Sequence, residues 1–246
     1  MADEEGPVIK PATNPPSDPA KSAVFIFLHG LGDDGYGWAD IADQFQAAHK
    51  LPHLKWIFPS APENRDAMER AWFTPTGLSP VANSRPELDD PEDEDGLMRS
   101  LRSIEAMIDD VVAKGTPAER VILGGFSQGC AMTLLVGLMS KWTEKLGGLA
   151  GLSGFIPLAG KIKQLREENN LPGKVEKQVP MFIARGTKDM LIPKRYWRIC
   201  METLKDIGID DTTIESHEYE GMAHSASGAE LRDLCTWLEK TVPSIE

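Results

Sequence analysis

The chain has 246 residues, with 26 Lys and Arg against 38 Asp and Glu, which gives a formal net charge of −12. Such an acidic chain is not expected to bind nucleic acid or anionic membrane surfaces, because like charges repel. No apolar run in the sequence approaches the ~20 residues of a membrane span, so we expect no stable membrane insertion. The length suits one α/β domain with a substantial core.

Cysteine usage argues against two further classes of protein. The chain has Cys130, Cys200 and Cys235, an odd number spaced far apart, and no histidine lies at metal-ligand spacing from any of them. We therefore expect neither a disulfide framework nor a metal site, and no motif calls for a cofactor. Residues 1–19 lack the basic and apolar regions of a signal peptide. These features predict a cytoplasmic protein, with the nucleus as an additional location.

Strands and helices are predicted to alternate along the chain after a flexible Pro-rich lead-in over residues 1–22. In chain order they are strand 24–28, helix 38–45, strand 54–58, helix 97–111, strand 121–124, helix 128–139, strands 149–153 and 181–185, helix 197–207, strand 213–219 and helix 231–238. Continuous runs of β-forming residues are typical of parallel strands buried on both faces. Residues 23–246 are therefore expected to form a single α/β domain with a mostly parallel sheet and helices on both faces.

A candidate nucleophile lies where one of these strands gives way to a helix. Residues 125–129 read Gly-Phe-Ser-Gln-Gly, directly after strand 121–124 and at the start of helix 128–139. A nucleophile elbow requires this strand–turn–helix context, and small residues must flank the serine because the turn is tight. The pattern predicts that Ser127 is a nucleophile at the carboxyl edge of the sheet, as in the α/β-hydrolase fold.

A serine hydroxyl needs a base, and on this fold the base follows the serine in the chain. Only His217 and His224 do so. His217 lies inside strand 213–219, where a side chain points to a face of the sheet, whereas His224 follows the strand, where loop residues reach the catalytic edge. We therefore predict His224 as the base.

The third member of a triad is an acid that orients the base. Asp189 comes directly after strand 181–185, whereas Asp206, Asp210 and Asp211 flank the end of a helix and are expected at the surface. We predict Asp189 as the acid. A turn-forming role for Asp189 is the alternative, because the Gly-Thr-Lys-Asp sequence around it also suits a turn.

Two backbone N–H groups are needed to stabilise the oxyanion that forms during acyl transfer. One is expected from Gln128, the residue after the nucleophile, and the other from Leu31, in the glycine-rich loop after the first strand. His29 follows that strand immediately, and we expect its ring to fix the loop through hydrogen bonds.

Several long motifs resemble the acyl-protein thioesterase family, also described as the phospholipase/carboxylesterase group of α/β-hydrolases. They are HGLGD at 29–33, FPSAP at 58–62, WF at 72–73, GLSP at 77–80, GGFSQG at 124–129, LSG at 152–154, GTKD at 186–189 and YEGMAH at 219–224. The resemblance covers residues 23–243. It implies the triad Ser127, Asp189 and His224, oxyanion donors Leu31 and Gln128, and cleavage of long-chain acyl thioesters, notably palmitoyl-cysteine on proteins, and of lysophospholipids and small esters.

An acyl chain needs an apolar site, and the loops at the catalytic edge are expected to supply it. The candidates are Trp72, Phe73, Leu78, Phe155, Ile156 and Met190. Core packing is the alternative for each of them. Residues 73–96 are expected to form a lid, with the apolar residues 73–81 facing the acyl chain and the acidic residues 87–95 in water, because burying unpaired carboxylates is costly.

Three functions remain open from the sequence. A serine hydrolase that removes acyl groups from S-acylated proteins through an acyl-enzyme is the leading hypothesis. A general carboxylesterase or lysophospholipase with little action on proteins is the first alternative, and its substrates are acyl lipids and small esters. A non-catalytic α/β-hydrolase relative that serves as a binding module is the other.

Overall fold

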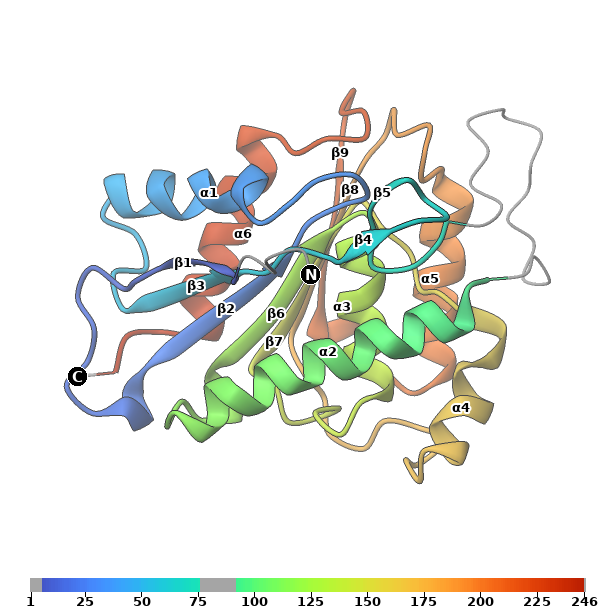
Figure 1. The fold of residues 1–246 in the computed structure, drawn as a ribbon, viewed down its shortest axis with the longest axis horizontal. Coiled ribbons are helices and arrows are strands. Elements are labelled where there is room, and N and C mark those ends of the chain that lie inside the picture. The colour runs from blue at the N-terminus through green and yellow to red at the C-terminus, as the bar shows by residue number, and fades with distance from the viewer. Residues whose placement is uncertain (1–5, 76–91, 246) are drawn as a thin grey trace.

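The computed structural model of the chain describes residues 6–75 and 92–245. Its centre is a seven-stranded sheet with the order β1-β3-β2-β6-β7-β8-β9 (Figure 1). Neighbouring strands are parallel except β1, which pairs antiparallel with β3. The strands are β1 Val8–Lys10, β2 Ala23–Leu28, β3 Leu54–Phe58, β6 Val121–Phe126, β7 Gly148–Leu152, β8 Met181–Gly186 and β9 Ile214–Tyr219. The predicted mostly parallel sheet of an α/β-hydrolase is confirmed.

Two layers of helices cover this sheet, because successive side chains of each strand point to opposite faces. Val24, Ile26 and Leu28 of β2 face a core shared with α2, α3, α4 and α5, whereas Phe25 and Phe27 face a second core under α1 and α6 (Figure 1). The helices are α1 Tyr36–Ala47, α2 Glu94–Ala113, α3 Gln128–Met139, α4 Ile162–Glu168, α5 Lys194–Asp206 and α6 Gly228–Thr241.

Helix α3 lies at the centre of the molecule, directly after the candidate nucleophile. Every residue from Gln128 to Met139 is buried. The sequence predicts this, since residues 128–139 are apolar on all sides. The elbow therefore rests on a helix that packing holds firmly in place.

The amino-terminal segment differs from its prediction as a flexible lead-in through residue 22. Val8–Lys10 forms the edge strand β1, and Pro19–Lys21 forms a 3-10 turn capped by Asp18. An edge strand needs hydrogen bonds on one side only, so a short stretch suffices. Proline is tolerated in the first turn of a helix, where its missing N–H has no partner to lose. The sheet thus begins before residue 23.

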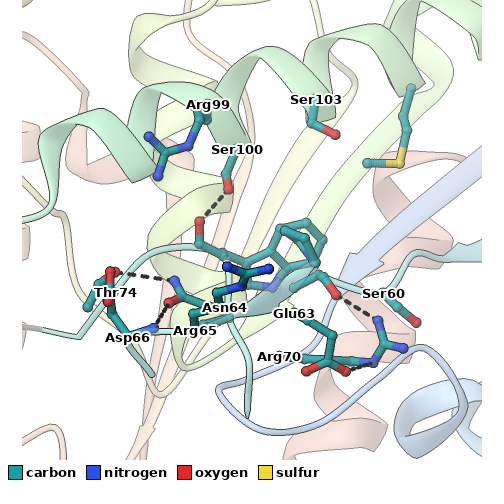
Figure 2. A pocket seen from close by; sticks show the side chains of 15 residues that line it. Ser60, Glu63, Asn64, Arg65, Asp66, Arg70, Thr74, Arg99, Ser100 and Ser103 are labelled. Atoms are coloured by element: carbon teal, nitrogen blue, oxygen red, sulfur yellow. Dashed lines mark hydrogen bonds and ion pairs between the residues drawn. The ribbon is translucent and has the colours of Figure 1, made fainter. Parts of the chain in front are cut away.

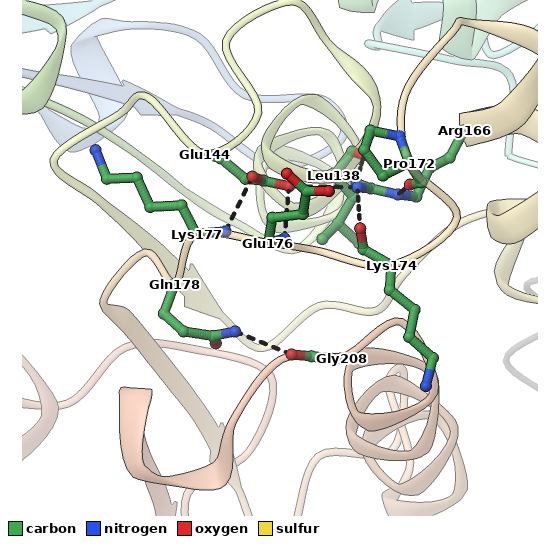
Figure 3. A network of polar contacts seen from close by, with 9 residues as sticks. All are labelled: Leu138, Glu144, Arg166, Pro172, Lys174, Glu176, Lys177, Gln178 and Gly208. Carbon is green, nitrogen blue, oxygen red and sulfur yellow. Dashed lines mark hydrogen bonds and ion pairs between the residues drawn. The ribbon is translucent and has the colours of Figure 1, made fainter.

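Two more elements went unpredicted, the hairpin of β4 Glu63–Asn64 with β5 Glu69–Arg70, and the helix α4. Each hairpin strand is two residues long, too short for an alternating pattern to show. α4 is held by Arg166, which is fully buried. Its guanidinium donates to the carbonyl oxygens of Leu138, Pro172 and Lys174 and pairs with Glu144 (Figure 3). This guanidinium fastens the segment between α4 and β8 to the end of α3.

The acidic end of the predicted lid also differs from expectation. Residues 76–91, including Leu78, lie outside the described residues, but the following acids are not simply in water. Asp93 caps α2, where its carboxylate accepts from Gly96 N at 2.9 Å and from Thr74 N at 2.7 Å. Glu92 accepts from Leu158 N at 2.8 Å. Backbone N–H partners offset the cost of taking a carboxylate out of water, so these acids begin a helix and fasten its start.

Candidate active site

Ser127 lies in a sharp turn between β6 and α3. Its backbone has φ +55° and ψ −114°, a strained conformation for a residue with a side chain, and its N–H donates to Leu152 O at 2.9 Å. A Cβ at Gly125 would lie 2.7 Å from the Leu28 carbonyl oxygen, and a Cβ at Gly129 would overlap that same carbonyl. Both glycines are therefore required for the serine to sit above the sheet.

The three residues predicted as a triad come together at the carboxyl ends of β6, β8 and β9. His224 Nε2 lies 2.9 Å from Ser127 Oγ, and His224 Nδ1 lies 2.8 Å from Asp189 Oδ2. The Asp189 side chain is fully buried, and its other oxygen accepts from the backbone N–H groups of Leu191 and Ile192 at 3.0 and 2.8 Å. An ionised carboxylate only accepts, so Nδ1 carries the hydrogen and Nε2 is free to accept the serine proton.

The alternative base His217 lies elsewhere. Its ring stands on the α6 face of the sheet, 5.1 Å from the ring of Phe182, and its Nε2 lies 3.2 Å from Glu215 Oε1. The period of two in strand 213–219 placed it on a face rather than at the end of the sheet. Asp206, Asp210 and Asp211 are exposed, as expected for residues beside the end of a helix.

A cavity of about 520 Å³ opens over the serine. It is lined by Gly30, Leu31, Asp33, Trp38, Pro75, Phe126, Ser127, Gln128, Leu191, Ile192 and His224. Both predicted oxyanion donors are in this set, and neither the Leu31 nor the Gln128 backbone N–H donates to any group in the described part of the chain. The geometry leaves both N–H groups available to a ligand beside Ser127.

Four apolar residues of this lining were not singled out in the sequence, namely Trp38, Phe126, Leu191 and Ile192. Each belongs to a segment whose position was predicted, such as Trp38 in the first helix. Their meeting around one cavity depends on the spatial order of the strands, so only their proximity in sequence to Ser127 and to the loops 29–37 and 186–189 could have drawn attention to them.

The residues predicted to bind an acyl chain lie in three different places: a second cleft, the surface and the core. Trp72 is buried and lines a second, polar cleft of about 880 Å³ between the β4–β5 hairpin and α2, rather than the cavity over Ser127 (Figure 2). Its indole N–H donates to His29 O at 2.9 Å, which joins it to the start of the loop that carries Leu31. Met190 is largely exposed beside the cavity residue Leu191.

Phe73, Phe155 and Ile156 are buried in the core on the α2 and α3 side of the sheet. The Phe155 ring lies 6.5 Å from that of Phe73 and 5.3 Å from that of Tyr196. They form one apolar cluster at the end of β7, and contact with an acyl chain stays a prediction for them.

The three cysteines lie in the interior of the fold, where burial disfavours the thiolate form. Cys130, Cys200 and Cys235 are free and buried, and burial raises the pKa of Cys200 to about 12 and that of Cys235 to about 11. Desolvation likewise raises the pKa of Cys130 well above its ordinary value. Within residues 6–75 and 92–245, no group of three or more His, Cys, Asp or Glu is placed to hold a metal ion. In the same residues every helix is too short or too polar to cross a membrane.

The chain shares most of its length with proteins of one family. The model of the phospholipase/carboxylesterase family matches residues 10–242. Acyl-protein thioesterase 1 of Yarrowia lipolytica is 34% identical over 234 residues, which cover 94% of this chain and 97% of that protein. The protein of the same name from Saccharomyces cerevisiae is 33% identical over 243 residues, covering 92% and 95%.

Solved structures agree with this relationship. The crystal structure of Arabidopsis thaliana SOBER1 superposes with a TM-score of 0.72 at 32% identity, covering 90% of this chain and 99% of that one. Acyl-protein thioesterase 2 of Zea mays has the same fold, with a TM-score of 0.73 at 22% identity over 96% and 98% of the two chains. The elbow, the converging side chains and these similarities lead to one conclusion: the chain belongs to the phospholipase/carboxylesterase family of α/β-hydrolases.

Proposed function

We propose that this protein is a serine hydrolase that cleaves acyl thioesters and esters, with S-acylated proteins, above all palmitoyl-cysteine proteins, as its main substrates. One observation carries the proposal, the unbroken hydrogen-bond relay from Ser127 Oγ through His224 to the buried Asp189, open to a cavity with apolar walls. Relatives that cover nearly the whole chain are named acyl-protein thioesterases, which supports the choice of substrate.

The relay suits acyl transfer in two steps. Ser127 Oγ attacks the carbonyl carbon while its proton moves to His224 Nε2, and the carbonyl electron pair becomes an oxyanion facing the Leu31 and Gln128 N–H groups. When the oxyanion collapses, the carbon–sulfur bond breaks and the thiolate takes the proton from His224. The products of this step are a free thiol and an acyl-enzyme ester on Ser127.

Water completes the cycle. His224 removes a proton from a water molecule as its oxygen attacks the acyl carbon, and a second oxyanion forms in the same place. Its collapse releases the fatty acid and returns the proton to Ser127. Throughout, Asp189 holds the imidazole in the required tautomer and stabilises its positive charge. With an oxygen ester, the first leaving group is an alcohol instead of a thiol.

Turnover of matched substrates tests the proposal. We expect a palmitoylated cysteine peptide and long-chain acyl thioesters to be hydrolysed with a higher kcat/KM than acetyl esters, because each buried CH₂ contributes about 0.8 kcal/mol. A preference for lysophospholipids and small esters over the peptide would favour the general carboxylesterase alternative. Ser127→Ala is the control and should abolish all of these activities, together with covalent labelling by a fluorophosphonate. Failure of the wild type to label would leave the binding-module alternative.

The compartment stays a prediction. We infer a cytoplasmic location, with the nucleus as an additional one, supported by three cysteines that are free and buried, as fits a reducing compartment.

A further inference from the structure

The backbone at residues 29–31 is fastened on one side by an imidazole ring. His29 is buried, with 1% of its surface exposed, and lies at the start of the loop that carries Leu31. His29 Nδ1 lies 2.6 Å from Gly30 O, and Ala61 N donates to His29 Nε2 at 2.8 Å. Because Nε2 accepts a hydrogen bond, the neutral ring carries its hydrogen on Nδ1, which donates to Gly30 O. Burial also lowers the pKa of His29, which favours this neutral form.

Gly30 O and Leu31 N–H belong to the same peptide group. In a trans peptide the C=O and N–H bonds are coplanar and point in opposite directions. With Gly30 O held against the His29 ring, the Leu31 N–H must point away from that ring. Leu31 lines the cavity over Ser127, and its N–H has no partner in the described part of the chain.

Rotation of this peptide group would otherwise be easy. Gly30 has no side chain and so permits a wide range of backbone angles. Its place is also tight, since a Cβ added there would lie 3.3 Å from Ser127 Cβ. A side chain at position 30 would thus crowd the nucleophile, and the freedom that glycine brings there has to be restrained by a contact elsewhere.

The neighbouring peptide groups are restrained from the β4–β5 side. Trp72 Nε1 donates to His29 O at 2.9 Å, and Gly32 N donates to Arg70 O at 2.9 Å. The side-chain amide of Gln128 bonds the same segment, accepting from Trp72 N at 3.1 Å and donating to Phe73 O at 3.0 Å. The two predicted oxyanion donors are therefore joined through one buried segment. Among the described residues, the peptide group that contains the Leu31 N–H has two partners, both at Gly30 O: the His29 ring at 2.6 Å and the Asp33 N–H at the longer distance of 3.4 Å. The ring therefore makes the shorter of the two hydrogen bonds that restrain this group.

We propose that His29 is a positioning residue whose Nδ1–H, by holding Gly30 O, keeps the Leu31 N–H directed at the oxyanion over Ser127. This inference rests on the proposed function, because it assigns His29 a part in the same acyl transfer. The inference goes beyond fixing the loop, because it assigns the effect on kcat to one hydrogen bond, from His29 Nδ1–H to Gly30 O. Removing a single oxyanion donor costs about 10²–10³ in kcat, which sets the scale of the expected effect.

Two substitutions of His29 separate the two ring hydrogen bonds. The Asn carboxamide reaches the position of Nδ1 and can donate to Gly30 O, whereas the Gln carboxamide reaches the position of Nε2 and can accept from Ala61 N. Each variant loses one buried hydrogen bond, so thermal unfolding should show similar losses of stability. With an acyl thioester, His29→Gln should lower kcat by about 10²-fold with little change in KM, and His29→Asn by less than about 5-fold.

A trifluoromethyl ketone supplies a second readout. Addition of Ser127 Oγ to its carbonyl produces an oxyanion in the same place, so its affinity should fall in parallel with kcat in His29→Gln and be largely kept in His29→Asn. Equal losses of kcat and of ketone affinity in the two variants would overturn the assignment. Ser127→Ala distinguishes failure of the proposed function from failure of this inference. If Ser127→Ala retains turnover, the proposed function fails. If it is inactive and His29→Gln and His29→Asn lose kcat equally, only the inference about His29 fails.

A double-mutant cycle covers the case in which His29→Asn does not fold and cannot serve as the control. Leu31→Pro removes the N–H itself at a partly exposed residue. If the ring acts through that N–H, adding His29→Gln to Leu31→Pro should lower kcat by less than about 3-fold. Losses that multiply in the double variant would mean that the ring acts on the rate by another route, which contradicts the proposal.

Discussion

At the scale of single residues, the acid of the relay has two jobs. One Asp189 oxygen bonds the His224 ring, while the other accepts from two backbone N–H groups of its own loop, a turn-forming arrangement. The sequence offered a catalytic role and a turn-forming role as alternatives, and the geometry accommodates both at once. Because one oxygen orients the His224 ring and the other holds the loop, a substitution that changes only one of them can separate the catalytic role from the turn-forming role.

Asp189→Asn keeps the shape of the side chain and one acceptor oxygen. When that oxygen accepts from the backbone N–H groups of Leu191 and Ile192, the NH₂ group faces the His224 ring and cannot accept from its Nδ1–H. We expect kcat to fall by about 10⁴-fold, slightly less than for Ser127→Ala, with thermal unfolding near that of the wild type. His217→Asn is the matched control on β9 and should change turnover by less than about 2-fold. If His217→Asn lowered kcat as much as Asp189→Asn does, the assignment of His224 as the base would be wrong.

At the scale of elements, α4 depends on one buried cation. The guanidinium of Arg166 donates to Leu138 O at 2.6 Å and to Pro172 O at 2.8 Å, while Glu144 lies 3.5 Å away (Figure 3). The predicted helices show an apolar stripe or, in α3, apolar residues nearly all round. By contrast α4 spans only seven residues, and Ile162 and Leu165 are its buried apolar side chains. Polar ties therefore supply what its small apolar face does not.

Arg166→Met fills a similar volume but leaves the carbonyl oxygens of Leu138 and Pro172 buried without donors. We expect the free energy of unfolding, measured in urea, to fall by about 3 kcal/mol. Arg198→Met removes an exposed pair with Glu202 on α5 and should cost less than about 0.5 kcal/mol. If Arg166→Met lowered the free energy of unfolding as little as Arg198→Met, water would be able to bond the carbonyl oxygens of Leu138 and Pro172 as well as the guanidinium does.

At the scale of the whole molecule, buried titratable groups make stability depend on pH in opposing directions. Burial raises the pKa of Glu230 to about 7 from an ordinary value of 4.5. This carboxyl is part of the capping box of α6, and its Oε1 has no partner in the described residues. Burial lowers the pKa of both His29 and His53 below 6.5. The folded protein thus favours a neutral form at all three positions.

The unfolded chain releases the Glu230 proton near pH 4.5, whereas the folded protein keeps it until about pH 7. The contribution of this carboxyl to folding is therefore complete below pH 4.5 and is lost as the pH rises to 7. Glu230→Gln cannot titrate, so its stability relative to the wild type should rise by roughly 3 kcal/mol between pH 4.5 and pH 7.5 in urea unfolding.

A difference between the two proteins that stays constant over this range would show that the Glu230 carboxyl has the same pKa folded and unfolded. His29 and His53 are common to both proteins and cancel from the comparison. In each protein by itself they act in the other direction, because the unfolded rings bind a proton below pH 6.5 that the folded rings resist binding.

The sequence by itself determined the elements that show a periodic apolar pattern over several turns or a continuous run of apolar residues. β2, β3, β6 to β9 and the helices α1, α2, α3, α5 and α6 were predicted with boundaries that differ by a few residues. The order of strand and helix then fixed which ends of the strands meet, so Ser127, Asp189 and His224 could be named before any coordinates. Chain order and local chemistry suffice for this, because every member of the relay lies in the turn or loop that follows a strand.

Only the tertiary structure decided which residues surround that relay and what holds them. Trp72 was predicted beside the acyl chain, and the fold places it against the loop that carries Leu31, where its indole N–H donates to His29 O. Its contact with an acyl chain stays a prediction. The hairpin β4–β5, the edge strand β1 and α4 are each too short to show a pattern. Partners distant in sequence stabilise them, such as Gly32, whose N–H donates to Arg70 O of the hairpin. Contacts between segments far apart in the chain leave no periodic trace in a single sequence, so they emerge only when the chain is folded.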